Sequence, residues 1–287
     1  MKNPNALPTA LITGASAGIG AEFVRLLAEE RKWNFKLVAR RRERLETLKA
    51  EAERIWASTP DAARPHAEVM ECDLCDESAL NSLLRGLEKS PALDLLIKNA
   101  GYGTYGEFCY LDPARRLKMI RLNNEVPVLL TAAQLPGMLD RGSGRIIYVC
   151  STAAFLPIPF MVTYCATKAF LLNFSLALDA EVRHRGVFVT AHCPGPTESE
   201  FHEVAGRREK LRNLPVMSAR VVAQEALRAS ERGRSLVVNG AWNRMFAFAA
   251  RSVPPAWGAW LVERELRSDL RAENVRQNTG QTGKKHI

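Results

Sequence analysis

Short apolar runs alternate with amphipathic segments along most of the 287-residue chain. The apolar runs predict strands, and the segments between them, with apolar residues three and four positions apart, predict helices. Each predicted strand is largely apolar instead of alternating apolar with polar residues, which is typical of parallel strands covered on both faces. The predicted strands are residues 9–13, 35–40, 67–72, 93–100, 144–150, 187–193 and 235–240.

Amphipathic helices are predicted between these strands, and two of them carry start signals. Asp76 and Asp112 stand at plausible N-cap positions, and Pro113 occupies a first-turn position. The predicted helices are residues 19–32, 41–57, 76–90, 164–185, 218–233 and most of 111–139. The alternation indicates an α/β fold: a doubly wound, Rossmann-type parallel sheet of about seven strands with helices on both faces, forming a three-layer sandwich.

The chain has no interior linker rich in Gly, Pro or Ser, so we expect residues 1–276 to form a single domain. Within it, residues 196–216 have mixed charge and are interpreted as a substrate lid, with an ordinary surface helix and loop as the alternative. Residues 241–272 are a predicted C-terminal extension of two amphipathic helices broken at Pro254–Pro255. Residues 277–287 lack an apolar period and are predicted to form a disordered tail.

The C-terminal extension contains three of the five tryptophans, namely Trp242, Trp257 and Trp260. Three uses compete for it: packing on the parent domain, a subunit interface in a homodimer or homotetramer, and shallow peripheral contact with a membrane. Packing or dimerisation is the favoured interpretation. The chain has no run of 18 apolar residues, so we expect no transmembrane span and a cytoplasmic protein.

Composition adds little to this picture. The net charge of +9 fits a solvated basic surface, and it also fits an anionic ligand, a nucleic acid or a membrane surface. Aromatic residues are not interleaved with the Lys and Arg residues, so we expect no nucleic-acid partner. The six cysteines and five histidines lack the spacing of a metal site, and the cysteines are interpreted as reduced free thiols.

A glycine loop, TGASAGIG, joins the first predicted strand to the first predicted helix. Glycine lets the backbone pass close to a phosphate, and the helix start directs free N–H groups towards it. The alternative is a tight turn that binds no ligand. The loop residues that we expect to contact a dinucleotide are Gly14, Ser16, Gly18, Ile19 and Gly20.

Arginines follow the second predicted strand, where an NAD-binding fold usually has an acidic residue for the ribose 2′-hydroxyl. Here Ala39 is followed by Arg40, Arg41 and Arg42. A guanidinium binds a 2′-phosphate through paired, charge-assisted hydrogen bonds, so the sequence favours NADP over NAD. Arg40 is the preferred ligand and Arg41 the second, while Arg42 belongs to the solvated first turn of the next helix.

Three motifs in order, TGASAGIG at 13–20, KNAG at 98–101 and YCATK at 164–168, resemble those of the short-chain dehydrogenase/reductase family, classical type. The resemblance covers roughly residues 9–201, and the C-terminal part is similar to a broad-specificity bacterial-type branch. It implies reversible hydride transfer between a nicotinamide and a carbonyl carbon, with the dinucleotide as cofactor and no metal.

The resemblance also places residues beside the cofactor. Lys98 replaces the first asparagine of the family's N-N-A-G, and we expect this departure to weaken a structural hydrogen bond. The matching positions are Asp73 and Leu74 near the adenine, Asn99, Ala100 and Gly101 along the cofactor, and Pro194, Gly195 and Thr197 at the nicotinamide end.

Four residues match the family's catalytic set. Ser151 stands thirteen residues before Tyr164, and the resemblance implies that it steadies the substrate oxygen. Asn123 matches the asparagine that holds a water beside Lys168, with Asn124 as the second choice. These residues come from different predicted elements, which makes the set far more specific than a lone serine or a lone tyrosine–lysine pair.

Tyr164 and Lys168 can also be argued from chemistry. A carbonyl oxygen gains negative charge on reduction and needs a proton donor, which Tyr164 supplies. Lys168 lies one helical turn after Tyr164, where its charge would lower the tyrosine pKa. Lys168 would also bind the nicotinamide ribose. Tyr164 would contact the cofactor as well. Apolar residues around 155–162 favour a hydrophobic ketone, aldehyde or secondary alcohol as substrate.

We therefore expect an NADP-dependent oxidoreductase. Two alternatives stay open: an NADP-binding sensor or scaffold without turnover, and a peripheral membrane or nucleic-acid protein that binds through its charge.

Overall fold

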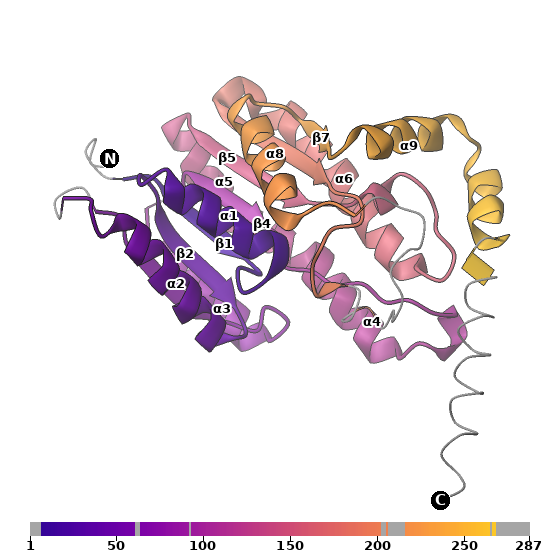
Figure 1. Cartoon of the computed structure of the whole chain (residues 1–287), viewed down its shortest axis with the longest axis horizontal. Coiled ribbons are helices and arrows are strands. Elements are labelled where there is room, and N and C mark those ends of the chain that lie inside the picture. Colours follow the sequence, from indigo (N-terminus) through magenta and orange to yellow (C-terminus); the bar gives the residue numbers. More distant parts are fainter. Residues whose placement is uncertain are drawn as a thin grey trace, which may run out of the picture.

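The computed structural model describes residues 7–60, 64–91, 93–201, 205, 216–264, 266 and 267. Within these residues, seven parallel strands form one sheet in the order β3-β2-β1-β4-β5-β6-β7 (Figure 1). The strands are β1 Thr9–Thr13, β2 Asn34–Ala39, β3 Ala67–Glu71, β4 Leu95–Lys98, β5 Gly144–Val149, β6 Val187–Cys193 and β7 Leu236–Val238. Every strand predicted from the apolar runs is present, shifted by at most a few residues at its ends.

Helices connect the strands and cover both faces of the sheet (Figure 1). The α-helices are α1 Gly18–Glu29, α2 Arg42–Trp56, α3 Glu77–Glu88, α4 Pro113–Ile120, α5 Val126–Arg141, α6 Val162–Val182, α8 Ala219–Glu231 and α9 Ala241–Ser252. Asp76 and Asp112 cap α3 and α4 as predicted, accepting hydrogen bonds from the backbone N–H groups of their first turns. The doubly wound α/β sandwich is thus confirmed.

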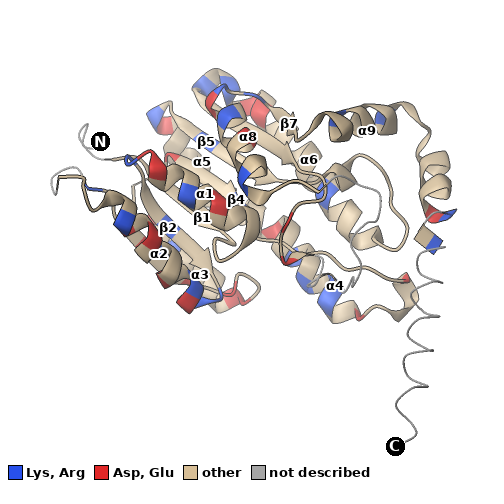
Figure 2. Cartoon of the chain, viewed as in Figure 1, with Lys and Arg blue, Asp and Glu red and all other residues tan. Residues whose placement is uncertain are grey.

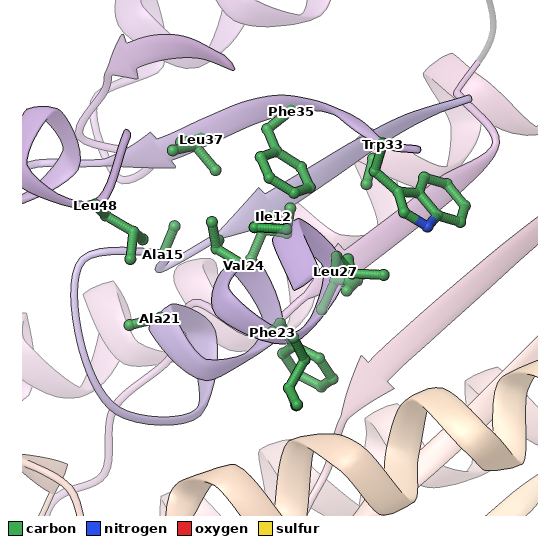
Figure 3. Close-up of a cluster of buried hydrophobic side chains, with 14 of the residues drawn as sticks. Ile12, Ala15, Ala21, Phe23, Val24, Leu27, Trp33, Phe35, Leu37 and Leu48 are labelled. Carbon is green, nitrogen blue, oxygen red and sulfur yellow. The ribbon is translucent and has the colours of Figure 1, made fainter. Parts of the chain in front are cut away.

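Two apolar clusters lie between the helices and the sheet. One packs α1, α2 and α8 against one face, with Ile12, Phe23 and Phe35 completely buried (Figure 3). The other packs α3, α5 and α6 against the opposite face around Leu96 and Tyr148. Because both faces are covered, the interior strands are largely apolar, which accounts for the sequence pattern.

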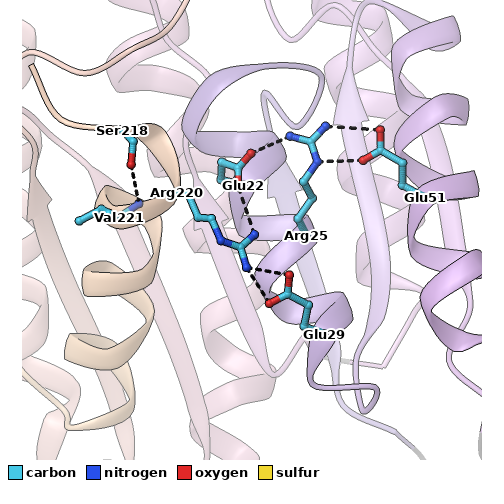
Figure 4. A network of polar contacts seen from close by, with 7 residues as sticks. All are labelled: Glu22, Arg25, Glu29, Glu51, Ser218, Arg220 and Val221. Atoms are coloured by element: carbon cyan, nitrogen blue, oxygen red, sulfur yellow. Dashed lines mark hydrogen bonds and ion pairs between the residues drawn. The ribbon is translucent and has the colours of Figure 1, made fainter.

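A charged network ties α1 to its neighbours on the outer surface (Figure 4). Arg25 of α1 pairs with Glu22 at 2.7 Å and with Glu51 of α2 at 2.8 Å. Arg220 of α8 pairs with Glu29 of α1 at 2.7 Å. Each of these part-exposed pairs contributes only about 0–1 kcal/mol, so the network adds little to the stability of the fold.

The sheet order places the glycine loop at a topological switch point. β1 lies between β2 and β4, and successive connections run in opposite directions from it along the sheet. In open parallel sheets, ligands bind outside the carboxyl ends of the strands at such a point. The loops that follow β1 at Thr13 and β4 at Lys98 meet there, which positions the candidate site.

Several regional predictions have a partial outcome. The C-terminal extension begins with α9 and continues in a second helix over residues 255–264, so the predicted break at Pro254–Pro255 is confirmed. Most of the predicted lid, 202–204 and 206–215, lies outside the described residues, as does the predicted tail 277–287. In the part of the chain that the structure describes, no helix is both long and apolar enough to cross a membrane.

Candidate active site

The glycine loop needs glycine at specific positions. Gly14 and Gly18 have φ angles of +66° and +54°, a region that L side chains rarely adopt. A Cβ atom on Gly14 would lie 2.9 Å from Cα of Ala100, and one on Gly20 would clash with the carbonyl of Gly14. The sequence therefore has glycine where the loop packs against the segment after β4.

Hydrogen bonds of Thr13 and Asn99 join the glycine loop to the segment after β4. The backbone N–H groups of Asn99 and Ala100 both donate to Oγ1 of Thr13 at 3.1 Å. The side-chain amide of Asn99 donates to the carbonyls of Thr13 and Gly14, also at 3.1 Å. The family-matched Asn99 thus shapes the glycine loop from the neighbouring strand end.

The start of α1 fits a phosphate group. Ala17 occupies the N-cap position in an extended conformation, and no side chain caps the first turn, which begins at Gly18. A helix start without a side-chain cap leaves backbone N–H donors and a positive dipole end directed outward. These features, together with the tight glycine backbone, fit the pyrophosphate of a dinucleotide, which Gly14, Ser16, Gly18, Ile19 and Gly20 would border.

The arginines after β2 divide into two groups. Arg41 donates to Oγ of Ser16 from Nη2 at 3.2 Å and from Nε at 3.4 Å, which joins it to the glycine loop. Nη1 of Arg41 also lies 2.8 Å from Glu200, and Arg44 pairs with the same carboxylate. Arg40 is exposed, and its charge opposes the rise of the Cys75 pKa that burial causes, so Arg40 lies near the segment after β3.

That segment contains the residues assigned to the adenine. Leu74 is buried, whereas Asp73 is exposed and accepts a hydrogen bond from the backbone N–H of Cys75 at 3.0 Å. Burial raises the pKa of Cys72 to about 11 and also raises that of Cys75. Both shifts favour the protonated thiol, in agreement with the interpretation of these cysteines as free thiols.

Ser151 and Tyr164 meet beyond the carboxyl end of β5. Ser151 is the N-cap of a short 3₁₀ turn, where its Oγ accepts from the backbone N–H of Ala153 at 3.1 Å. Tyr164, in the first turn of α6, is 6% exposed and is hydrogen-bonded to the Ser151 side chain. Burial raises the pKa of Tyr164, and this hydrogen bond opposes the rise.

The expected lowering of the Tyr164 pKa by Lys168 is not found. Nζ of Lys168 lies 5.8 Å from the centre of the tyrosine ring and donates to the carbonyl of Val149 at 2.7 Å. Lys168 is itself 5% exposed, and burial lowers its pKa. We expected the lysine charge to set the tyrosine pKa, whereas desolvation dominates both groups.

Asn123 lies in a π-helical turn, Arg121–Glu125, between α4 and α5. The predicted helix over 111–139 therefore contains a local insertion at this residue, a feature often found at functional sites. Asn123 is 1% exposed, and its amide donates at 3.0 Å to the Tyr102 carbonyl and to Oγ1 of Thr167. A Cβ on Gly101 would lie 2.9 Å from Oδ1 of Asn123 and 3.7 Å from Nζ of Lys168.

Asn124, the second choice, has a different role. Its amide donates to the carbonyl of Thr167 at 3.0 Å, which joins the π turn to the backbone of α6. Asn123 and Lys168 border Gly101 together, so the structure brings these two side chains near each other.

The segment after β6 closes the site. Thr197 is buried and its hydroxyl donates to the carbonyl of Gly195 at 2.9 Å, while the Pro194 carbonyl accepts from the N–H of Thr152 at 2.9 Å. Further along, the ring of Phe201 lies 5.2 Å from that of Tyr164. Phe201 and Glu200 thus belong to the site, and no short motif marks either residue.

Lys98, which we expected to weaken a structural hydrogen bond, has partners of its own at the end of β4. It is 4% exposed, its Nζ donates to the Pro127 carbonyl at 3.1 Å and to Thr131, and it lies 3.6 Å from the centre of the Tyr148 ring. Burial lowers its pKa well below the usual 10.5. These polar and aromatic partners satisfy the amine at the point where the family has asparagine.

The fold and this arrangement of loops define a Rossmann-type, dinucleotide-binding α/β protein. A family model described as short chain dehydrogenase matches residues 8–210, and the chain belongs to this family of oxidoreductases. The family supports binding of a nicotinamide cofactor.

Two solved structures are similar over most of the chain. A short-chain dehydrogenase from Sphingobium yanoikuyae in complex with NADPH is 30% identical, with a TM-score of 0.75, and covers 86% of this chain and 94% of its own. A bulky-bulky ketone specific alcohol dehydrogenase from Comamonas testosteroni is also 30% identical, with a TM-score of 0.71, covering 86% and 93%.

Among curated relatives, human inactive hydroxysteroid dehydrogenase-like protein 1 is 26% identical over 268 residues, which are 91% of this chain and 77% of that protein. The chain spans between 52% and 77% of the length of the first curated relatives that it matches.

Proposed function

We propose that the protein is an NADP-dependent oxidoreductase that interconverts an apolar ketone or aldehyde with the corresponding alcohol. The observation that supports the proposal is that Tyr164 is hydrogen-bonded to Ser151, with Nζ of Lys168 5.8 Å from the centre of the tyrosine ring. The tyrosine is buried and its pKa is raised, so it holds a proton at neutral pH.

The chain's own residues account for the proton chemistry. In reduction, the Tyr164 hydroxyl donates its proton to the carbonyl oxygen of the substrate, and Ser151 holds that oxygen in place. Lys168 and Asn123 border Gly101 behind the tyrosine, where Lys168 would bind the nicotinamide ribose and Asn123 would position it. The bound dinucleotide would supply the hydride, so carbon gains a hydride and oxygen gains a proton.

Cofactor preference rests on the arginines after β2. Arg41 lies against Ser16 of the glycine loop, where a 2′-phosphate would be bordered by two hydrogen-bond donors and one hydroxyl. Arg40 lies near Cys75, after β3, and would add positive charge. The structural relative in complex with NADPH supports the same preference.

The remaining cofactor contacts follow the motif positions. Asn99, Ala100 and Gly101 line the strand end beside the glycine loop, while Pro194, Gly195 and Thr197 would border the nicotinamide. Leu74 and Asp73 would border the adenine.

The decisive experiment measures NADPH oxidation with a panel of bulky ketones for the wild type and Tyr164→Phe. We expect turnover in the wild type, a loss of about 10²-fold or more in the variant, and unchanged NADPH affinity by fluorescence titration. Turnover that survives in Tyr164→Phe would contradict the assigned proton donor.

A dinucleotide-binding protein without turnover is the second candidate, favoured by the similarity to a human relative named as inactive. NADPH binding by the wild type with no oxidation across the whole panel would support this candidate.

A further inference from the structure

The C-terminal helices turn their apolar side chains outward. On α9, the buried positions are Asn243 and Ala247, whereas four large apolar residues are exposed. Their exposed fractions are 55% for Trp242, 53% for Met245, 37% for Phe246 and 76% for Phe248. An amphipathic helix of a globular domain ordinarily buries its apolar stripe, so this orientation is inverted.

The second helix, residues 255–264, has the same orientation. Gly258 faces inward, where a Cβ atom would clash with the side chain of Leu156. Trp257, Trp260 and Leu261 recur at helical spacing and are 71%, 59% and 57% exposed. We call the seven exposed side chains of the two helices the C-terminal apolar surface.

Basic residues accompany this surface. α9 contains Arg244 and Arg251, both exposed, and no Asp or Glu (Figure 2). Exposed tryptophans beside arginines, on a helix that lies along a surface, are the pattern of an interfacial membrane helix, because the indole rings sit at the headgroup level and the guanidinium groups attract anionic lipids.

We propose that the C-terminal apolar surface binds the surface of an anionic lipid bilayer. A second copy of the chain fits the surface less well. A two-fold contact would bring the arginines of two α9 helices together with no carboxylate on α9, and Glu263 of the second helix already pairs with Arg267. The printed sequence after Arg267 offers few apolar residues to pair with this surface, namely Leu270, Ala272, Val275 and Ile287.

The surface adjoins the segment that leads to the proposed proton donor. Arg251 of α9 lies 4.9 Å from the centre of the Phe155 ring, and Gly258 abuts Leu156. Leu266 is buried with Tyr105 and Phe160. Residues 155–160 precede α6, whose first turn carries Tyr164, so bilayer contact would place the substrate entrance at the lipid boundary.

This placement identifies the class of substrate, an inference that rests on the proposed function. A ketone or alcohol that is dissolved in the bilayer would reach the site without crossing water. Apolar molecules concentrate in lipid by about tenfold for every two CH₂ groups, so the gain grows steeply with chain length.

The test is sedimentation of the full-length protein with vesicles of phosphatidylglycerol and phosphatidylcholine in equal parts, and with phosphatidylcholine alone. We expect binding to the anionic vesicles that falls with added salt. The double variant Trp257→Ser, Trp260→Ser should bind at least about tenfold more weakly. Val221→Ser, which changes a 43% exposed residue on α8, is the matched control and should bind as the wild type does.

Three outcomes decide the proposal. No sedimentation of the wild type with anionic vesicles overturns it. Equal binding by the double variant also overturns it, provided that circular dichroism shows an unchanged fold. A wild-type dimer in analytical ultracentrifugation that the double variant dissociates, with no vesicle binding, overturns it in favour of a subunit interface.

Turnover is tested separately, so that the two proposals can fail independently. Tyr164→Phe should bind vesicles as tightly as the wild type. With a long-chain ketone carried in the vesicles, the double variant should lose activity, while its activity with a short water-soluble ketone stays unchanged. Loss of both activities to the same degree would overturn the inferred substrate class and leave the enzyme assignment intact.

Discussion

The carboxylate of Glu200 lies 2.8 Å from Nη1 of Arg41, although 159 positions separate the two residues in the chain. Arg44 pairs with the same carboxylate, and these two hydrogen bonds lower the pKa of Glu200. The segment after β6 is thereby attached to the start of α2. Glu200 occupies donors of the arginine that we assign to a 2′-phosphate, so the two anions would compete.

Replacement of Glu200 by Gln should strengthen NADPH binding, because Arg41 and Arg44 would lose a competing carboxylate. We expect a gain on the order of threefold for NADPH and no change for NADH, since the ion pairs are exposed. Fluorescence titration with both cofactors measures the ratio. Glu198→Gln, two residues away, is the matched control, and an equal gain in that variant would refute the competition.

Arg41→Ala should weaken NADPH binding more than NADH binding, by roughly tenfold in the ratio, because a charge-assisted contact to phosphate is lost. Arg40→Ala should have the smaller effect, since Arg41 is the arginine that hydrogen-bonds Ser16 of the glycine loop. The same titration compares them, and a larger effect of Arg40→Ala would restore the order expected from the sequence.

The raised pKa of Tyr164 predicts opposite pH dependences for the two reaction directions. Reduction needs the neutral phenol, so it should persist from neutral pH until the pH rises through the raised pKa. Alcohol oxidation needs the tyrosinate, so its rate should increase with pH. Ser151→Ala removes the hydrogen bond that lowers this pKa. In profiles of kcat against pH, the fall of reduction and the rise of oxidation should both move to higher pH.

Lys98→Met should increase the free energy of unfolding near neutral pH. The buried amine favours its neutral form, while in the unfolded chain Lys98 is charged below 10.5. The unfolded state therefore binds more protons between the lowered pKa and 10.5, and wild-type stability should rise with pH across this window. Urea unfolding at several pH values should show this slope in the wild type and a smaller one in Lys98→Met.

The Lys98→Met variant should leave no hydrogen-bonding group without a partner. The Thr131 hydroxyl donates to the Pro127 carbonyl at 2.6 Å and lies 2.6 Å from the Tyr148 hydroxyl, so both oxygens keep partners. A Lys98→Met protein that is less stable than the wild type at every pH would show that the amine contacts outweigh its desolvation.

His192 predicts a loss of stability in acid. It is completely buried, Nε2 lies 2.6 Å from Oδ1 of Asn239, and burial lowers its pKa to about 4 from 6.5. Between these values the unfolded state binds the extra proton, so stability falls as the pH falls, by about 3 kcal/mol in all. Urea unfolding at pH 7 and pH 5 should show the decline, and His192→Gln should reduce it.

The strands and the glycine loop were predictable because their signals are local. Apolar runs mark strands buried on both faces, and Gly14 and Gly18 stand where the backbone adopts positive φ. The positions of Ser151, Tyr164 and Lys168 follow from the spacing of their motifs.

The features that could not be predicted from the sequence depend on contacts between distant residues or on burial. No spacing rule relates Glu200 to Arg41, because their contact depends on the path of the chain after β6. The direction of the Tyr164 pKa shift depends on desolvation, which only the packed structure reveals. The partners of Lys98 lie on α5, more than one element away.

The π turn at Arg121–Glu125 adds one residue to a helical ladder, shown by the bond from the N–H of Val126 to the carbonyl of Arg121. This extra residue rotates α5 about the helix axis by roughly a quarter of a turn relative to α4. Removing one residue here would restore an ordinary helix and swing Asn123 or the whole inner face of α5 out of register. The π turn therefore sets the rotation of α5 about its axis relative to α4. A one-residue deletion here should destabilise the protein far more than one in a surface loop.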